Sequence, residues 1–486
     1  MGIDQQTVVI GGGLTGLACA FWLQKLGARV TLLEASDRAG GEIATIRRRG
    51  FLFEAGPQCP RFPRAVWELV CELGLEKEFV SVDPRAKRFV WKDGELHPAP
   101  LSPWGLIKTR LVGIGCKARF IAEPFRNWRP PQSEESLAQF VRRKFGDEAV
   151  DYLVDPFAAS VYFSGPEEMG MESTLPSIAR WEREFGSVFR GGIHARRKNG
   201  KRSAPAERSA TNNRPAPGVP VTDFLPPLGS FRSGFATLTD RLGETLGDSL
   251  RLGACVEGVC PAADVSQGRW RIRLRGGEEL LGESVVTATP AYEAARVLQP
   301  VAPHLSSLLG GIPYSPLAVV ASAYERNQVR HSLQGFGFNV PRREGLHVIS
   351  CTWNSSLFAG RAPEGKVLIT SFARPLPNEA FFEMAPEATA EMAEGEVAEI
   401  LGISGSPIDR AVWKYPRALP QYRVGHTQWV AAIRDALRSL PGLQLAGNYL
   451  EGRSIGDSIE IGYRAAEEVL SDRSFSAAKA AEARRS

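Results

Sequence analysis

The chain has 486 residues, of which 43% are hydrophobic, and its formal net charge is +5. This length predicts a large core divided among two or three domains, while the small net charge gives no reason to expect nucleic acid as a partner. Seven scattered cysteines without a C-x-x-C pair argue for a reducing compartment and against a zinc site. The sequence contains no run of eighteen apolar residues, so we expect no helix that spans a membrane.

The first predicted elements are a strand, a glycine turn and a helix in "VVIGGGLTGLACA", residues 8–20. Gly11, Gly13 and Gly16 match G-x-G-x-x-G, in which the glycines permit a tight turn, a close approach to a pyrophosphate and close packing of the helix on the strand. A second strand, "RVTLLE", ends in Glu34, where the fingerprint expects an acid for the ribose hydroxyls. The stretch therefore predicts a dinucleotide site, and the acid disfavours NADP.

The next stretch, "EASDRAGGEI", distinguishes NAD from FAD. Arg38 is a forked cation suited to a phosphate, and Gly40 and Gly41 permit a second close backbone approach beside the cofactor. This extension resembles the two-dinucleotide-binding FAD proteins of the amine oxidase class. The resemblance implies that the cofactor is FAD.

The rest of the chain alternates between strand-rich and helical text, which predicts an α/β fold: a Rossmann-like FAD-binding domain interrupted by an α+β substrate domain and a helical, membrane-contacting region. The predicted segments are FAD-binding parts at 1–85, 226–300 and 416–475, a helical region at 86–189, a basic low-complexity loop at 190–225, a substrate-binding β domain at 301–415 and a disordered tail at 476–486.

Four later stretches look like the sequences of protoporphyrinogen oxidases, in the order of that family. They are "SPLAVVASAYE", "GFGFNVPRREGLHVISCTWNSSLFAGRAPEGKVLITSF", "YPRALPQYRVGH" and the closing "LAGNYLEGRSIGDSIEIGYRAA". With the N-terminal motifs, the resemblance covers roughly residues 5 to 470, apart from the basic loop. It implies FAD contacts at Gly11, Gly12, Gly13, Leu14, Thr15, Gly16, Glu34, Ala35, Arg38, Gly40, Gly41, Glu42, Gly56, Pro57, Gln58, Cys59, Val256, Asn448, Arg453, Ser454 and Ile455.

The same resemblance implies a reaction in which hydride moves from a bridging carbon of a porphyrinogen to FAD, and oxygen reoxidises the flavin to give hydrogen peroxide. Such chemistry requires neither a catalytic side chain nor a metal. The implied substrate residues are Lys108, Ser160, Phe336, Gly337, Asn339, Ile349 and Phe358. Phe336 and Phe358 are equally explained as core aromatics of a sheet.

Several positions depart from the family pattern. Ser160 and Ser164 stand where the family has glycines, and Asn339 stands where an aliphatic residue is usual. No arginine occupies the propionate-binding position, where Lys108 is the next cation. Alternatives therefore stay open: a coproporphyrinogen III oxidase, an amine or carotene oxidoreductase, or a flavin-binding scaffold without turnover.

A last feature lies at residues 99 to 130, where apolar, aromatic and basic residues are mixed in short pieces broken by prolines and glycine. This pattern suits contact with a membrane surface without crossing it, or a helical subdomain packed on the protein's own pocket. We expect a cytoplasmic protein bound peripherally to a membrane. Whether it forms a homodimer stays open.

Overall fold

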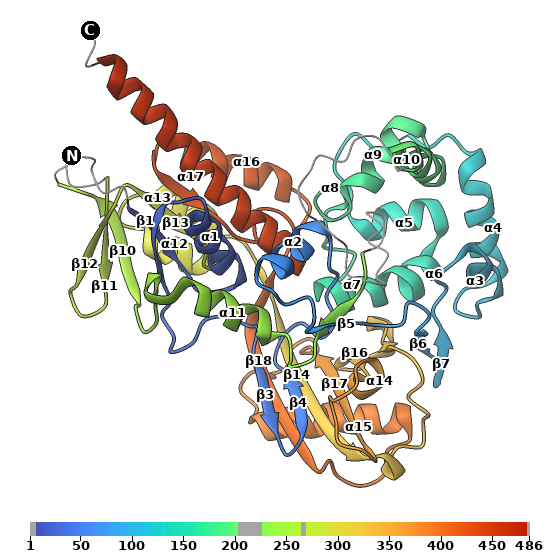
Figure 1. Ribbon diagram of the computed structural model, residues 1–486. Helices are drawn as coiled ribbons and strands as arrows, with labels where there is room; N and C mark the ends of the chain where they lie inside the picture. The colour runs from blue at the N-terminus through green and yellow to red at the C-terminus, as the bar shows by residue number, and fades with distance from the viewer. Residues whose placement is uncertain (1–5, 130, 203–225, 264–268, 484–486) are drawn as a thin grey trace. The chain divides into compact units, whose positions relative to one another are not determined.

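The computed structural model describes residues 6–129, 131–202, 226–263 and 269–483 (Figure 1). The chain forms two compact units. The first unit is Met1–Pro84, Val221–Pro313 and Gln428–Ser486, and the second unit is Arg85–Pro220 and Tyr314–Thr427.

A parallel sheet of five strands organises the first unit, in the order β19-β13-β1-β2-β9. The central strand β1 is almost wholly buried, because helices cover the sheet, as parallel sheets require. Helix α17 packs along α1 (Figure 1). The bounds are β1 Gln6–Ile10, α1 Leu14–Lys25, β2 Arg29–Leu33, β9 Leu250–Arg251, β13 Ser284–Thr287, β19 Leu443–Leu445 and α17 Ile455–Ala483.

Smaller elements complete the first unit. An antiparallel sheet contains β10 Val256–Pro261, β11 Trp270–Leu274 and β12 Glu279–Gly282, and two further strand pairs are β3 Thr45–Arg48 with β4 Phe51–Glu54 and β5 Phe79–Ser81 with β8 Gly229–Phe231. The remaining helices are α2 Arg64–Glu72, α11 Ala236–Leu246, η3 Gly247–Ser249, α12 Ala291–Leu298, α13 Pro303–Gly310 and α16 His426–Leu437, the last of which begins at the unit boundary.

A seven-stranded sheet in the order β18-β14-β17-β16-β15-β6-β7 organises the second unit. Only β15 and β6 pair in parallel among these neighbours. Helix α15 shares a core with one face of the sheet, and α7 shares a smaller apolar cluster with the other face. The bounds are β6 Arg88–Lys92, β7 Glu95–Pro98, β14 Tyr314–Glu325, η5 Arg326–Gln328, β15 Gly337–Asn339, η6 Arg342–Glu344, β16 Val348–Thr352, α14 Asn354–Leu357, β17 Lys366–Ala373, α15 Pro386–Leu401 and β18 Asp409–Pro420.

A helical layer in the second unit has its own core, which includes Leu111, Phe140 and Tyr152. It consists of α3 Pro103–Lys108, α4 Ile114–Ala122, η1 Glu123–Phe125, α5 Leu137–Phe145, α6 Asp147–Ala149, the π-helix η2 Val150–Val154, α7 Asp155–Tyr162, α8 Met171–Thr174, α9 Pro176–Phe185 and α10 Val188–Arg202. Within the described ranges, no helix combines the length and apolarity that a membrane span requires.

The structure corrects two segments that composition assigned to irregular chain. Helix α10 occupies 188–202, where a basic loop was expected from residue 190; the remainder of that loop lies outside the described residues. Helix α17 continues to Ala483, through most of the expected disordered tail at 476–486. For α10 the physical reason is a distant contact, because the Glu123 carboxylate accepts hydrogen bonds from the amides of Val188 and Phe189 at the start of the helix.

The unit boundaries also differ from the expected ones. The second unit extends to Thr427 rather than to 415, because β18 continues its pairing with β14 as far as Pro420. Helix α13 belongs to the first unit, although the expected substrate domain began at 301. The helical region expected at 86–189 opens with the strands β6 and β7.

Candidate functional site

The glycine turn after β1 is built as the fingerprint requires. Gly11 has φ +105°, and its N–H donates to the carbonyl of Leu33 at 2.8 Å. A Cβ on Gly16 would lie 1.9 Å from the carbonyl oxygen of Gly11. These two glycines are therefore needed for the turn itself and for the packing of α1 on it.

Gly13 differs from its neighbours, because its backbone is extended and a Cβ there would meet nothing within 4 Å. Gly13 is the N-cap of α1, and it forms a β-bridge with Gly40. The N–H of Gly40 donates to the carbonyl of Gly12 at 2.8 Å. The two glycine turns thus lie together at a helix N-terminus, with open space beside Gly13, and this cradle fits a pyrophosphate.

Glu34 follows β2 and points back to the glycine turn. Its Oε2 accepts the N–H of Gly12 at 2.7 Å, and its Oε1 accepts the N–H and the hydroxyl of Ser36 at 2.8 and 2.6 Å. A carboxylate accepts up to about four hydrogen bonds, so Glu34 retains acceptor capacity for ribose hydroxyls. The prediction for Glu34 is consistent with this geometry, and Ser36 is a partner that the motif does not show.

We expect Glu34→Ala to weaken FAD retention by about 1.5–3 kcal/mol, the scale of hydrogen bonds to charged groups. The measurement is a titration of the dissociation constant by flavin fluorescence. Asp37→Ala is the matched control, because Asp37 is an exposed acid three residues away. Equal affinity in the two variants would mean that the ribose is held elsewhere.

Arg38 holds the second turn together. Its guanidinium donates to the carbonyls of Ala39, Gly41 and Ile43 at 3.3, 2.5 and 3.0 Å. The sequence predicted a phosphate-binding cation here, whereas the hydrogen bonds in the structure go to the backbone. Next to this turn, burial raises the pKa of the Glu42 carboxyl to about 7, although the side chain keeps an accessible surface.

The other predicted cofactor residues lie in several separate segments of the first unit. Helix α17 packs so closely on α1 that a Cβ on Gly462 would lie 2.5 Å from the carbonyl of Thr15. Ser454 caps α17 through reciprocal hydrogen bonds with Asp457. The amide of Gln58 donates to the carbonyls of Glu54 and Gly56. Leu14 and Thr15 are the first residues of α1, Ala35 follows Glu34, and Pro57 and Cys59 flank Gln58. Val256 is buried at the start of β10. Asn448, Arg453 and Ile455 lie just before or at the start of α17.

Thr289 is a polar group at the glycine turn that motif analysis missed. Its methyl group would lie 2.9 Å from a Cβ on Gly11. Its hydroxyl is buried, and it has no hydrogen-bond partner within the described part of the chain. The only sequence signal is its position two residues after the short strand β13. An orphaned hydroxyl beside the cradle is a further group that fits a bound dinucleotide.

In the second unit, several predicted substrate residues lie on the sheet face that carries α7. Asn339 pairs with Ser350 across β15 and β16, and the N–H of Val340 donates to the carbonyl of Ile349 at 2.9 Å. Gly337 precedes them on β15, with φ +143° and no room for a Cβ. Ser160 lies on α7, where its hydroxyl donates to the carbonyl of Phe157 at 3.1 Å.

This face forms an apolar cluster with a half-buried aromatic border. Ile349 is fully buried in it, and Phe163 and Phe372 stack with their ring centroids 5.6 Å apart. The other members are Ala159, Leu317, Val319, Trp413, Tyr415 and Ala418. The sequence motifs identified Ile349 and missed both phenylalanines. Side chains alternate along β17, so that Ile369 and Ala373 face the opposite core and Phe372 faces the side of Ile349. Only this alternation could have indicated Phe372 from the sequence.

The remaining predicted substrate residues lie outside this cluster. Phe336 precedes β15 and lies under the guanidinium of Arg88, 4.5 Å from its ring centroid. Phe358 is buried beneath Arg361. Lys108 is exposed at the end of α3.

Cations lie beside the N-terminal end of α7. Asp155 accepts hydrogen bonds from the N–H and Nε of Arg342 at 2.6 and 2.5 Å. Burial raises the pKa of Asp155, although Arg342 opposes this shift. Burial and the nearby Arg342 charge lower the pKa of Arg374, which follows β17. Arg342 is thus occupied by Asp155, and Arg374 is the cation of this pair that a substrate carboxylate could use.

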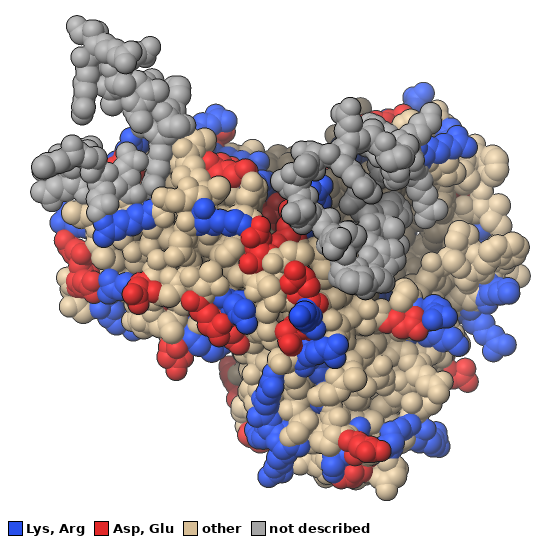
Figure 2. Space-filling model, in the orientation of Figure 1, with Lys and Arg blue, Asp and Glu red and all other residues tan. Residues whose placement is uncertain are grey.

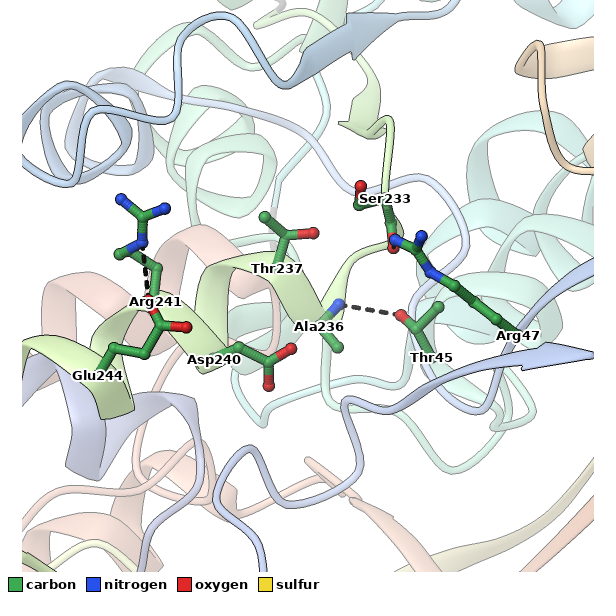
Figure 3. Close-up of a pocket in the computed structure, with 8 residues that line it drawn as sticks. All are labelled: Thr45, Arg47, Ser233, Ala236, Thr237, Asp240, Arg241 and Glu244. Atoms are coloured by element: carbon green, nitrogen blue, oxygen red, sulfur yellow. Dashed lines mark hydrogen bonds and ion pairs between the residues drawn. The ribbon is translucent and has the colours of Figure 1, made fainter.

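A separate polar pocket of about 440 Å³ lies between β3 and α11 in the first unit (Figure 3). Arg241 pairs with Glu244 at 3.1 Å, and Arg47 donates to the carbonyl of Ser233 at 2.6 Å. None of the predicted site residues lines it. Among the described residues, no group of ligands could hold a metal ion, and all seven cysteines are free.

The comparisons with known proteins agree with this geometry. The family described as flavin containing amine oxidoreductase matches residues 14–470. A chloroplastic protoporphyrinogen oxidase of Nicotiana tabacum is 30% identical over 95% of this chain and 85% of its own length, and a coproporphyrinogen III oxidase of Bacillus subtilis (strain 168) is 27% identical over 96% and 98%. The crystal structure of a candidate protoporphyrinogen oxidase from Exiguobacterium sp. 255-15 superposes with a TM-score of 0.78 at 24% identity, covering 96% of this chain and 98% of that one. The chain therefore belongs to the flavin-containing amine oxidoreductase family and is an FAD-dependent oxidoreductase.

Proposed function

We propose that this protein oxidises protoporphyrinogen IX to protoporphyrin IX, with oxygen as the acceptor and hydrogen peroxide as the by-product. The observation that carries the proposal is the apolar, aromatic face of the second unit around Ile349 and Phe372, which suits a flat macrocycle. The Nicotiana relative, by its name a protoporphyrinogen oxidase, supports the same substrate class.

Different residues of the first unit would bind different parts of FAD. The N-terminus of α1 with Gly13 and Gly40 would bind the pyrophosphate, and Glu34 would bind the ribose. When bound, FAD supplies the hydride-accepting chemistry. The chain's own residues bind the macrocycle, orient it and exclude water, so no side-chain nucleophile is required.

The choice between two porphyrinogens depends on the carboxylates. Coproporphyrinogen III carries four propionates and protoporphyrinogen IX carries two, so the former needs a more basic pocket. Arg374 and Arg342 lie beside the aromatic face, but Arg342 is already paired with Asp155 and Glu167. Because Arg342 is already paired, it contributes less charge to a substrate carboxylate, which favours the substrate with two propionates; coproporphyrinogen III remains the second candidate because of the Bacillus relative.

The test supplies each porphyrinogen to the purified yellow protein and follows the growth of porphyrin fluorescence. We expect growth with protoporphyrinogen IX and slower growth with coproporphyrinogen III, together with stoichiometric peroxide. The reverse order would assign the second substrate. No growth with either, together with no bleaching of the flavin under anaerobic conditions, would contradict a catalytic role.

We also propose that the second unit contacts a membrane surface through α3, α4 and η1. Six apolar side chains here are at least 49% exposed: Leu101, Trp104, Ile107, Ile114, Ile121 and Phe125. Figure 2 shows mostly uncharged surface over α3 and α4, with Lys and Arg at its edge. Leu111 and Val112 belong instead to the helical core, so the contact surface is narrower than the segment 99–130. Exposed apolar residues bordered by cations suit the interface of an anionic membrane.

Flotation with vesicles that contain anionic lipid tests this contact. We expect the wild type to float in low salt, and Trp104→Glu plus Ile107→Glu to remain at the bottom of the gradient. Leu252→Glu plus Leu281→Glu is the matched control, since these exposed apolar residues lie in the first unit. Wild-type protein that does not float would exclude the contact.

A further inference from the structure

The end of α7 is unusual. Phe163 is the C-cap of this helix, with φ 50° and ψ 35°, which is the left-handed region. Glycine is the common residue at such a helix end, because a Cβ there is crowded by the backbone. A bulky aromatic side chain in this conformation is an outlier of the kind found at functional sites.

Contacts at both ends of α7 fix this conformation. At the N-terminal end, Asp155 accepts two hydrogen bonds from Arg342. At the C-terminal end, the amide of Gln421 donates to the carbonyl of Tyr162 at 3.2 Å. A π-helix, η2, directly precedes α7, and π-helical turns also concentrate at functional sites.

The strained backbone places the ring of Phe163 on the apolar face of the sheet. The ring stacks on Phe372 with an interplanar angle of 26°, and both rings are half-buried. The two rings border the cluster that contains Ile349. Glycine at position 163 would relieve the backbone strain, but it would also remove one of the two rings that border the cluster.

We propose that Phe163 is a substrate-binding residue whose ring forms, with Phe372, an aromatic wall for a flat apolar tetrapyrrole. This inference rests on the proposed function for the identity of the ligand. The backbone strain at Phe163 is maintained because it holds the ring in place before the ligand arrives, so the wall is preorganised.

Two variants separate the ring from the backbone. Phe163→Gly and Phe163→Ala both remove the ring, but only alanine keeps a Cβ in the left-handed conformation. We therefore expect the glycine variant to have the higher melting temperature, the reverse of the usual order at a helical position. Both variants should raise KM for the porphyrinogen by a similar factor of about two to ten, the range that corresponds to aromatic stacking, with little change in kcat.

Binding of protoporphyrin IX, followed by its Soret absorbance, supplies a readout that does not need turnover. Both variants should bind this porphyrin two- to tenfold more weakly than the wild type. Phe157→Ala should leave binding unchanged, because Phe157 is an exposed aromatic on α7 outside the cluster.

The outcomes are distinguishable. Unchanged binding in both ring-deletion variants would overturn the proposal, and so would a defect confined to the less stable alanine variant. If the wild type oxidises neither porphyrinogen, the proposed function fails, while the titration with protoporphyrin IX still decides whether Phe163 forms the wall.

Discussion

Gly13→Val protein is expected to fold normally and to be colourless, whereas the wild type is yellow and releases FAD on acid precipitation. The backbone of Gly13 is extended, with φ −69° and ψ 175°, which valine adopts readily. A Cβ at this position meets no protein atom within 4 Å, so the new side chain disturbs nothing in the chain itself. It would fill the space beside the N-terminus of α1 that the pyrophosphate requires.

Two further variants make the Gly13 result specific. Gly395→Val is the matched control, because this glycine on α15 also has open space around it, so the variant should keep its flavin. Gly16→Val should damage the turn itself, since its Cβ would lie 1.9 Å from the carbonyl of Gly11. The measurements are the flavin absorbance of each protein and the melting temperature after removal of FAD. A yellow Gly13→Val protein would show that the nucleotide lies elsewhere.

The strand, turn and helix around Gly11 could be predicted from the sequence because their requirements are local. A positive φ at Gly11 and the close packing of Gly16 both arise within ten residues of chain, and only glycine satisfies them. Glu34 could be predicted for the same reason, since a strand of fixed length carries it back to the turn.

Features that depend on distant segments could not be predicted in this way. Composition predicts a loop after residue 190, but Glu123, more than sixty residues earlier, caps α10. Leu111 and Val112 read as part of an amphipathic surface segment, whereas the structure buries them in the core of the helical layer. Phe163 and Phe372 lie more than two hundred residues apart in the sequence, and their stacking depends on the packing of α7 against β15 and β16.

The second large effect is expected in the helical layer, where Lys144 on α5 is completely buried. Its Nζ lies 2.7 Å from Oε1 of Glu182 on α9 and 3.5 Å from Oε1 of Glu123 on η1. Glu123 also accepts the hydroxyl of Ser187 at 2.6 Å and the amides at the start of α10. Lys144 on α5 is thus linked to α9 through Glu182, and to η1 and α10 through Glu123. The segment η1 also contains the exposed Phe125.

Lys144→Met should therefore destabilise the protein by about 3–5 kcal/mol at neutral pH, since it takes one counter-charge away from two buried carboxylates, of which Glu182 keeps, among the described residues, only Arg143. Arg142→Met is the matched control, because Arg142 is the exposed cation two residues earlier on α5. It pairs with Asp147 at the surface, where such pairs contribute at most about 1 kcal/mol. The measurement is urea unfolding of each variant, monitored by tryptophan fluorescence.

The loss in Lys144→Met should also depend on pH. Burial alone would raise the pKa of Glu182, but hydrogen bonds from Arg143 and Lys144 outweigh it and lower the pKa below its ordinary value. A carboxyl with a lowered pKa in the folded state stabilises the protein above its unfolded pKa of about 4.3, and this contribution is lost as the pH falls through the folded value. Without Lys144, a buried carboxyl can instead take up a proton. The difference in unfolding free energy between wild type and Lys144→Met should thus be largest near pH 7 and shrink toward pH 4, and a difference that stays constant across this range would show that Lys144 acts by packing alone.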